Sequence, residues 1–303
     1  MTNCGASGGD GCCTSLDVPS ASYYRTYTNN GGGPTGEADP ATVSGLRLDK
    51  YLVTVGRFRQ FVSAWNGGAG FTPPAGSGKH THLNGGAGLN GVDGGYEPGW
   101  AIADNGNIAP TTANLTSCLP SPFSSWTASA GSNENRPINC VNWWESYAFC
   151  IWDGGFLPSE AEWELAAAGG SQQREYPWGN TAPGATNQYA IYGDGQGNCY
   201  YPTGTLAQCV DATNMAPVGA IATLGAGLWG QLDLAGNVVE WNLDWYQSYA
   251  ACTDCADVTP NSGRVSRGGG FNTFASLLPS FSRGFTAPTV RQSNLGLRCA
   301  RTP

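Results

Sequence analysis

Apolar residues recur with a helical period in one stretch near the start of the chain. After Thr54 they occupy positions 55, 58, 61, 62 and 65, which lie on one face of a helix with 3.6 residues per turn. Thr54 is a residue type that caps the first turn of a helix, and Gly67 follows the last apolar position. The pattern predicts an amphipathic helix that starts after Thr54 and ends before Gly67.

Residues 137–170 contain the pattern of two further helices, separated by a Gly-Gly turn. Asn142 with Glu145, and Ser159 with Glu162, are spaced so that each pair can form a capping box. In this arrangement the side chains satisfy the first unpaired amides of the helix. A second Gly-Gly pair supplies a left-handed end for the second helix.

The other segments are rich in turn-forming residues. Residues 1–40 form a Cys/Gly-rich N-terminal segment, and we expect one folded domain over residues 41–303. Within it, residues 66–136 read as a long insertion rich in Gly, Pro, Ser and Asn, expected to be a functional or disulfide-pinned surface loop. Short β-like pieces follow late in the chain, at 238–246 and 264–272. This arrangement predicts an α+β fold with an irregular antiparallel core.

Composition and charge narrow the classes of partner. The 303 residues carry a net charge of −8 and contain no cluster of Lys or Arg, so attraction to nucleic acid or to anionic lipid is disfavoured. No apolar run reaches the roughly 20 residues of a membrane span. Residues 1–4 lack the apolar core of a signal peptide, so any export signal is expected to be removed or to lie outside the sequence.

The 11 cysteines are scattered and do not form the paired CxxC motifs of structural zinc sites. This distribution favours disulfides made in an oxidising compartment, so we expect an extracytoplasmic protein: secreted, periplasmic or a surface-anchored lipoprotein. Cys4 is expected to pair within Cys12-Cys13, and a lipid anchor at Cys4 is the alternative. Other candidate pairs are Cys118 with Cys140, Cys199 with Cys209, and Cys252 with Cys255, although CTDC could also be a redox or metal pair.

Five ordered segments carry a resemblance to a known family: LRLDKYLVTVGRFRQFV (46–62), LPSEAEWELAAAGG (157–170), YPWGN (176–180), DLAGNVVEW (233–241) and RGGGF…LGLRCAR (267–301). In this order they resemble the formylglycine-generating enzymes and their sulfatase-modifying-factor relatives. The resemblance implies a variant of the C-type lectin fold, loop-rich, with short antiparallel strands and about three helices.

The resemblance also implies a structural calcium loop and a long-range disulfide. The calcium ligands would be the side chains of Asp233 and Glu240 and the carbonyl groups of Gly236 and Val238, an all-oxygen set of the kind Ca²⁺ prefers. The alternative is that both carboxylates are ordinary turn and strand residues. Cys150 and Cys299 match family cysteines that link the helical block to the GLRCA segment.

Copper chemistry, in contrast, is not expected. The copper-dependent members bind Cu(I) through two thiolates just after the Gly-Gly turn, because soft sulfur ligands select this ion. The corresponding positions here are Thr273 and Leu278, and no cysteine lies between Gly270 and Arg298. The related iron-dependent oxygenases use histidines in an extra domain, whereas this chain has only His80 and His82, which read as part of a solvated turn.

The resemblance therefore leaves three hypotheses. In the first, the former active-site surface binds a protein or glycan ligand without catalysis. The second is a divergent oxidase acting on a protein cysteine, and the third a structural surface protein. A special form of the first is a variable ligand-binding protein of a diversity-generating retroelement. The ligand and the oligomeric state stay open. The expected binding surface comprises Asn272, Thr273, Phe274, Leu277, Leu278, Ser280, Phe281, Phe285 and Arg291.

Overall fold

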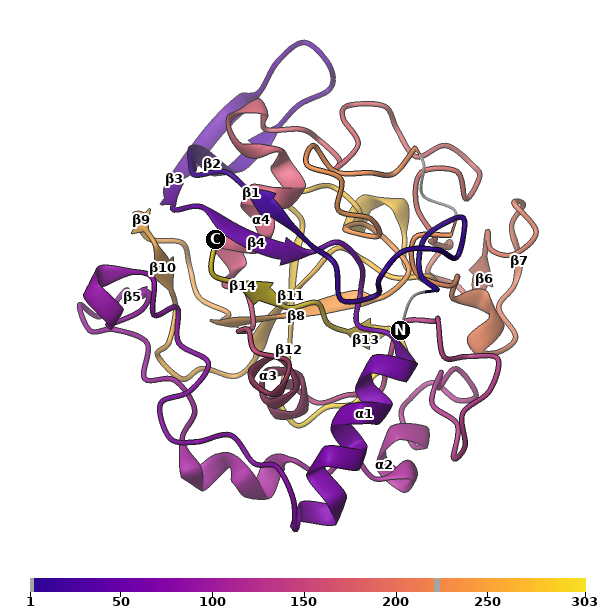
Figure 1. Cartoon of the computed structure of the whole chain (residues 1–303). Coiled ribbons are helices and arrows are strands. Elements are labelled where there is room, and N and C mark those ends of the chain that lie inside the picture. Colours follow the sequence, from indigo (N-terminus) through magenta and orange to yellow (C-terminus); the bar gives the residue numbers. More distant parts are fainter. Residues whose placement is uncertain (1–2, 221–223) are drawn as a thin grey trace.

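The computed structural model describes residues 3–220 and 224–303, and helices form a small part of them (Figure 1). The α-helices are α1 (Val55–Trp65), α2 (Thr112–Thr116), α3 (Trp143–Trp152) and α4 (Glu160–Ala168). Short 3₁₀ segments lie at Asn66–Gly68, Asn84–Gly86, Ile102–Asn107, Gly170–Gln172, Ala212–Asn214 and Ala275–Leu277. The longer helices α1, α3 and α4 are the ones the sequence predicts.

The sequence also predicts how these helices start. The side chain of Thr54 accepts a hydrogen bond from the amide of the third residue of α1. Asn142 with Glu145, and Ser159 with Glu162, form complete capping boxes at the starts of α3 and α4. Each box satisfies two amides that have no partner inside the helix. The predicted left-handed end of α4 is present as well, with φ 66° at its C-cap glycine.

The strands are short, and most of them pair antiparallel. They are β1 (Ser15–Val18), β2 (Ala21–Thr28), β3 (Thr35–Val43), β4 (Leu46–Asp49), β5 (Asn90–Gly91), β6 (Asn198–Cys199), β7 (Ala207–Gln208), β8 (Val239–Trp245), β9 (Cys252–Thr253), β10 (Cys255–Ala256), β11 (Arg264–Arg267), β12 (Arg283–Thr286), β13 (Leu295–Gly296) and β14 (Ala300–Arg301). Both β-like pieces that the sequence predicts are strands, β8 and β11.

The central sheet has the strand order β12-β11-β8-β13. Strand β8 pairs antiparallel with β11 and parallel with β13, and the register between β8 and β11 shifts between Arg264 and Ser266. A second sheet, β1-β4-β14, brings the early and late parts of the chain together. The fold is therefore α+β, as predicted, although its core sheet includes one parallel strand.

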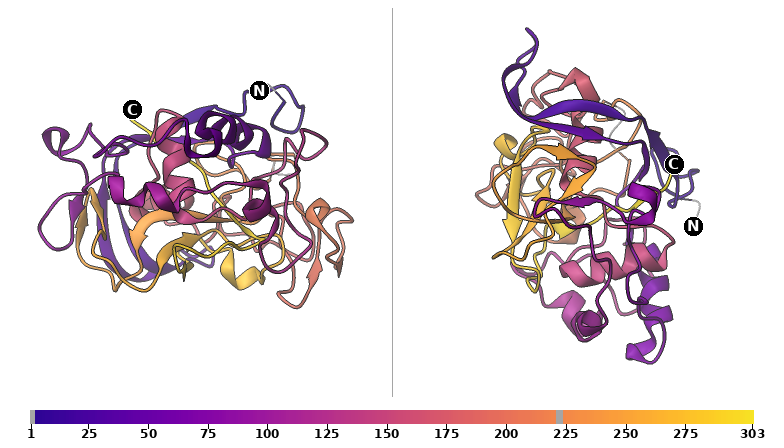
Figure 2. Two further views of the ribbon diagram at one scale, coloured as in Figure 1. Left: turned by 90° about the horizontal axis from the view of Figure 1, so that it is seen from below. Right: turned by 90° about the vertical axis from the view of Figure 1, so that its left-hand side faces the viewer.

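The two longest strands lie near the start of the chain, mostly within the segment 1–40 that the sequence describes only as Cys/Gly-rich. Strands β2 and β3 form an antiparallel hairpin that lies beside α4, with its tip projecting from the body (Figure 2). Side chains of β2 alternate between buried and exposed. The buried Tyr23 donates its hydroxyl to the carbonyl of Ala161 in α4, at 2.7 Å. The hairpin is thus part of the core.

The largest core cluster packs α1 against α3 and the central sheet. The rings of Phe58 and Phe149 stack with centroids 5.5 Å apart, and Phe61 meets Phe149 edge-on at 5.8 Å. Trp241 of β8 is fully buried, and its indole N–H donates to Val141 O at 3.1 Å. Each such ring contributes about 1.5–3 kcal/mol through burial, so the apolar face of α1 anchors this helix.

Ten of the eleven cysteines form disulfides, and the pairs Cys150–Cys299 and Cys118–Cys140 are confirmed. The others are Cys4–Cys12, Cys199–Cys209 and Cys252–Cys255, which leaves Cys13 free and exposed. Five disulfides indicate an oxidising environment. The described residues include no helix with the length and apolar character needed to cross a membrane.

Candidate functional site

The turn after β11 has a backbone that requires glycine. Gly268 and Gly269 adopt positive φ angles of 91° and 67°. A Cβ atom at Gly268 would lie 2.7 Å from the carbonyl oxygen of Leu234, too close for any other residue. A Cβ at Gly269 would lie 3.1 Å from both Thr273 Oγ1 and Leu278 Cδ2. Thr273 and Leu278 therefore converge on the same glycine.

Neither of these two side chains offers a ligand for copper. The hydroxyl of Thr273 donates to Gly270 O at 3.0 Å and accepts from Gly270 N at 2.9 Å. Leu278 is buried in a small apolar cluster with Ala190, Tyr192 and Ala235. One side chain closes its own turn and the other fills the interior, so this site does not fit Cu(I), which favours soft thiolates.

A cleft of about 280 Å³ opens beside this turn, along β8, β11 and β12. Three residues of the predicted binding surface line it: Thr273, Leu277 and Phe285. Leu277 is 43% exposed and Phe285 55%, and the nearby Phe274 is 48% exposed. Large apolar side chains this exposed around a concave site are typical of contact surfaces.

Other residues of the predicted surface serve the fold. Ser280 is buried and donates to Ala167 O at 3.0 Å, and the ring of Phe281 packs edge-on against Tyr27 at 5.2 Å. Arg291 binds the carboxylate of Glu145 with two nitrogens. Asn272 accepts a hydrogen bond from Asn294 at 2.9 Å. None of these predicted residues lines the cleft, whereas Asn294 does.

Several polar residues that line the cleft were not predicted, among them Arg267, Arg283, Gln292 and Asn294. Arg267 and Arg283 both bind Glu160 of α4, at 3.0 Å and 2.5 Å respectively. Arg267 also binds Glu164, so two carboxylates of α4 face the two positive charges beneath an apolar rim. These four cleft residues lie in the segment 267–301 that carries the family motif, but the pairing of both arginines with Glu160 spans more than a hundred positions and leaves no local signal.

The predicted calcium loop is buried around one arginine. Glu240 accepts hydrogen bonds from Arg298 at 2.6 and 2.8 Å and from the indole of Trp163 at 3.0 Å. Arg298 also donates to the backbone carbonyl of Asp233 at 2.9 Å. The carboxylate of Asp233 accepts from Gly219 N at 2.7 Å. Burial raises the pKa of both carboxyl groups, although the charge of Arg298 opposes the shift.

This loop supplies hard oxygen donors of the type that suits calcium. The backbone of the loop packs tightly against Ile191 at Gly236, because a Cβ atom at this position would lie 2.5 Å from Ile191 O. The carboxylate oxygens of Glu240, however, already have Arg298 as a cationic partner. A calcium ion bound through Glu240 would therefore have to share or displace this guanidinium group.

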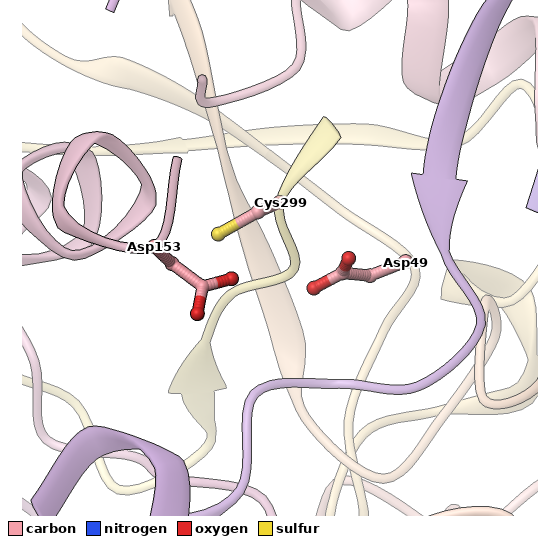
Figure 3. A group of neighbouring side chains, drawn as sticks. All are labelled: Asp49, Asp153 and Cys299. Atoms are coloured by element: carbon pink, nitrogen blue, oxygen red, sulfur yellow. The ribbon is translucent and has the colours of Figure 1, made fainter. Parts of the chain in front are cut away.

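A second group of possible metal ligands comprises Asp49, Asp153 and Cys299, whose side chains point toward one another (Figure 3). Cys299 is held in a disulfide. Arg57 binds Asp49 at 2.9 Å and Asp153 at 2.6 Å, and Arg301 contacts the same two carboxylates. These four charges balance, so the group reads as an ion-pair cluster beside a disulfide.

The interpretation of His80 and His82 as a solvated turn is wrong for His80. This ring is fully buried, with Nδ1 2.9 Å from Glu97 and Nε2 3.0 Å from Glu162. Burial lowers the pKa of His80, but the charge of Glu162 and hydrogen bonds to both carboxylates outweigh it and raise the pKa to about 10. The protonated ring ties the 66–136 insertion to the capping box of α4.

The elements and Gly-rich turns described above define the class of protein: a formylglycine-generating-enzyme-like variant of the C-type lectin fold. Two solved structures share this fold over nearly their whole length. PvdO from Pseudomonas aeruginosa aligns with a TM-score of 0.59 and 17% identity, covering 97% of this chain and 100% of that one. Treponema denticola variable protein 1 aligns with a TM-score of 0.53 and 19% identity, covering 96% and 95%. At these identities the likeness establishes the fold alone.

The sequence comparisons assign the chain to one family within this fold. A family model described as the sulfatase-modifying factor enzyme 1-like domain matches residues 18–303, and the chain belongs to this family. It is 31% identical to a formylglycine-generating enzyme of Thermomonospora curvata, over 68% of this chain and 73% of the relative. It is 30% identical to mouse inactive Cα-formylglycine-generating enzyme 2, over 67% and 65% respectively.

Proposed function

We propose that this family member is an extracytoplasmic recognition module whose cleft beside Thr273, Leu277 and Phe285 binds a protein or glycan ligand. One observation carries the proposal: the two positions that correspond to copper-binding cysteines converge on Gly269, yet one is a threonine and the other a buried leucine. A cleft lies beside this turn, and neither position carries a thiolate. A family scaffold with this combination is suited to binding without oxidation.

The remaining cysteines support the same conclusion. Ten of eleven are held in disulfides, and the free Cys13 lies in the N-terminal segment. A two-thiolate Cu(I) site needs two free sulfurs close together, and the folded, oxidised chain has one. The divergent-oxidase alternative would therefore require a ligand set without sulfur pairs, which Cu(I) does not favour.

The character of the cleft favours an uncharged contact. Glu160 and Glu164 together pair with the two arginines of the walls, and exposed rings lie at the rim. Aromatic side chains of this kind stack on sugar rings or fill apolar pockets in a partner protein. The five disulfides and the disulfide-rich surface loops support an extracytoplasmic setting, where such ligands are displayed.

Binding is tested by screening the purified, oxidised protein against glycan and surface-protein arrays. We expect a hit whose affinity falls at least tenfold in the variant Phe274→Ala/Phe285→Ala. The variant Leu206→Ala is the matched control, because Leu206 is 44% exposed but does not line the cleft. Equal losses in both variants, or binding unaffected by the cleft substitutions, would contradict the proposed site.

Loss of copper chemistry is tested separately. The wild-type protein is incubated with Cu(I) and a cysteine-containing sulfatase-type peptide, and the peptide is examined for an aldehyde by mass spectrometry. We expect no conversion by the wild type and no tight Cu(I) binding. The double variant Thr273→Cys/Leu278→Cys should gain Cu(I) binding, since both side chains lie beside Gly269. Aldehyde formation by the wild type would refute the proposal.

Calcium is proposed as a structural ion at the loop of Asp233, Gly236, Val238 and Glu240. Millimolar Ca²⁺ is expected to raise the melting temperature of the wild type and to have no effect on Glu240→Gln. Mg²⁺ serves as the control ion, because it demands a tighter octahedral site. An unchanged melting temperature in Ca²⁺ and in EDTA would mean that Arg298 alone balances the loop.

A further inference from the structure

A second cavity of about 290 Å³ lies apart from the cleft and shares no lining residue with it. Its walls come from the 66–136 insertion, from α3, and from strands β8 and β11. Much of the lining is aromatic: Trp143, Trp144, Tyr147 and Trp245. A concave, largely apolar site with a few polar groups is the usual form of a small-molecule site.

Arg264 is the only cation among the residues that line this cavity. Its guanidinium lies between two indoles, 3.6 Å from the ring centre of Trp143 and 3.9 Å from that of Trp245. Nη1 donates to Leu243 O at 2.5 Å. Nε is buried without a partner, and within the described chain Nη2 has no hydrogen bond either. Both faces of the group are covered, while the Nε–Nη2 edge is unpaired.

In the described part of the chain, Arg264 lacks the carboxylate partner that each of the fully buried arginines has. Arg57, Arg267 and Arg298 each have a carboxylate oxygen within 3.0 Å, whereas Arg264 forms no ion pair with any described residue. Arg264 is only partly exposed and has no charged partner in the described structure, and this partial burial lowers its pKa to about 9. An anion that binds the free edge would supply the missing partner. A carboxylate matches this edge with two parallel hydrogen bonds.

Two acidic residues, Glu97 and Asp104, line the cavity, and neither forms an ion pair with Arg264. The carboxylate of Glu97 is bound by the ring of His80 and accepts from Leu89 N at 3.0 Å. The protonated histidine is shared with Glu162, so these three side chains together keep one negative charge. Asp104 is the one lining carboxylate without a cationic partner in the described structure, and its contact is with the amide of Asn107 at 3.3 Å. Asp104 therefore disfavours an anion and limits its affinity.

We propose that this cavity binds a small carboxylate attached to a ring, with the carboxylate on the Nε–Nη2 edge of Arg264 and the ring against the indoles. Stacking over an aromatic face suits both a flat aromatic ring and a sugar ring. The shared chemistry is the ring-borne carboxylate. A free aromatic acid and a uronic acid are its two sources, and they are distinguished below.

The test uses the full oxidised protein and isothermal titration with four probes. Phenylacetate and glucuronate carry the carboxylate, and phenylacetamide and glucose are their neutral counterparts. We expect at least one acid to bind and its neutral counterpart to bind at least tenfold more weakly. Binding of phenylacetate alone assigns the aromatic source, and binding of glucuronate alone assigns the sugar source. Equal binding of an acid and its neutral counterpart, or no binding of either acid, would overturn the proposal.

Two substitutions with opposite expected effects locate the site. Arg264→Lys keeps the charge but loses the two parallel hydrogen bonds to the carboxylate, so the affinity for the acid should fall at least tenfold. Asp104→Asn removes the repelling charge and should increase acid affinity about threefold to tenfold. If Arg264→Lys does not fold, Asp104→Asn still decides, since an unchanged affinity would contradict the site. Phe285→Ala, in the separate cleft, should leave acid binding unchanged.

Discussion

Replacing His80 removes the cation between two buried carboxylates and gives the sharpest test of the core. In the variant His80→Gln, Glu97 and Glu162 lose the ring that lies 2.9 and 3.0 Å from them. All three side chains are nearly or fully excluded from solvent. Breaking a buried pair in this way costs about 3–5 kcal/mol, because an uncompensated charge stays in the interior.

The matched control is His82→Gln. His82 is partly exposed and lies only two residues away, with its ring stacked on Phe156 at 5.8 Å. It forms no ion pair in the described structure, so its replacement should cost about 1 kcal/mol or less. Urea unfolding under non-reducing conditions measures both variants. A loss of under 1 kcal/mol for His80→Gln would refute the reasoning.

The charge state of His80 can be observed directly. The chain contains two histidines, so a protein labelled with ¹⁵N-histidine gives Nδ1 and Nε2 signals from only two imidazole rings. At pH 8 the His80 ring should be protonated, since its pKa is raised to about 10 by Glu162 and Glu97 despite burial. The His82 ring should be neutral, because burial lowers its pKa. Two neutral rings at pH 8 would contradict the ion-pair assignment.

The raised pKa of His80 determines how the free energy of unfolding depends on pH. The folded pKa of His80 lies above the unfolded value of 6.5, so its contribution to stability is complete below pH 6.5 and disappears as pH rises through 10. Between pH 7 and pH 9 this contribution falls by about 2.5 kcal/mol. The NMR-derived pKa values in the folded protein and in urea provide the check.

Other substitutions test the scaffold. Cys150→Ser/Cys299→Ser removes a bridge with a sequence separation of 149, and urea unfolding should show a loss of about 3–5 kcal/mol; a loss under 1 kcal/mol would mean that packing alone holds the two ends. Ser159→Ala removes the cap of α4 and should cost about 1 kcal/mol, seen as a lower melting temperature, whereas Ser159→Asp should preserve it. Glu145→Gln leaves Arg291 without its partner and should cost about 3 kcal/mol or more, with Glu145→Gln/Arg291→Met less damaging than the single change. A loss in the double variant equal to the sum of the losses in Glu145→Gln and Arg291→Met would show that the pair is not coupled.

Local signals in the sequence predict the helices well. Capping boxes and glycine ends act over four residues, so Asn142, Ser159 and their glutamates can be read without the fold. The long-range pair Cys150–Cys299 and the turn after β11 follow from the family resemblance, whereas the other cysteine pairs were expected from their positions in the sequence. The hairpin β2–β3 was missed because its alternation is carried by Tyr and Arg among polar residues, which mimics an exposed loop.

The candidate site was predictable only in part. Thr273, Leu277 and Phe285 belong to the segment that the motif marks, and they line the cleft. Ser280, Phe281 and Arg291 come from the same segment, yet their contacts lie in distant elements. His80 shows the same limit, since its two partners follow 17 and 82 residues later. The residues next to His80 in the sequence do not reveal that its ring is buried, because the contacts that bury it come from remote segments.

The contacts of Arg298 have a consequence for biosynthesis. This one side chain binds Glu240 and the backbone oxygens of Asp49, Leu232 and Asp233, and the next residue forms the bridge to α3. Strand β14 then pairs with β4. A nascent chain that has not yet reached residue 298 lacks the cation, the sulfur and the strand that close its interior. The order of translation therefore leaves the completion of folding to the moment when nearly all of this sequence has emerged.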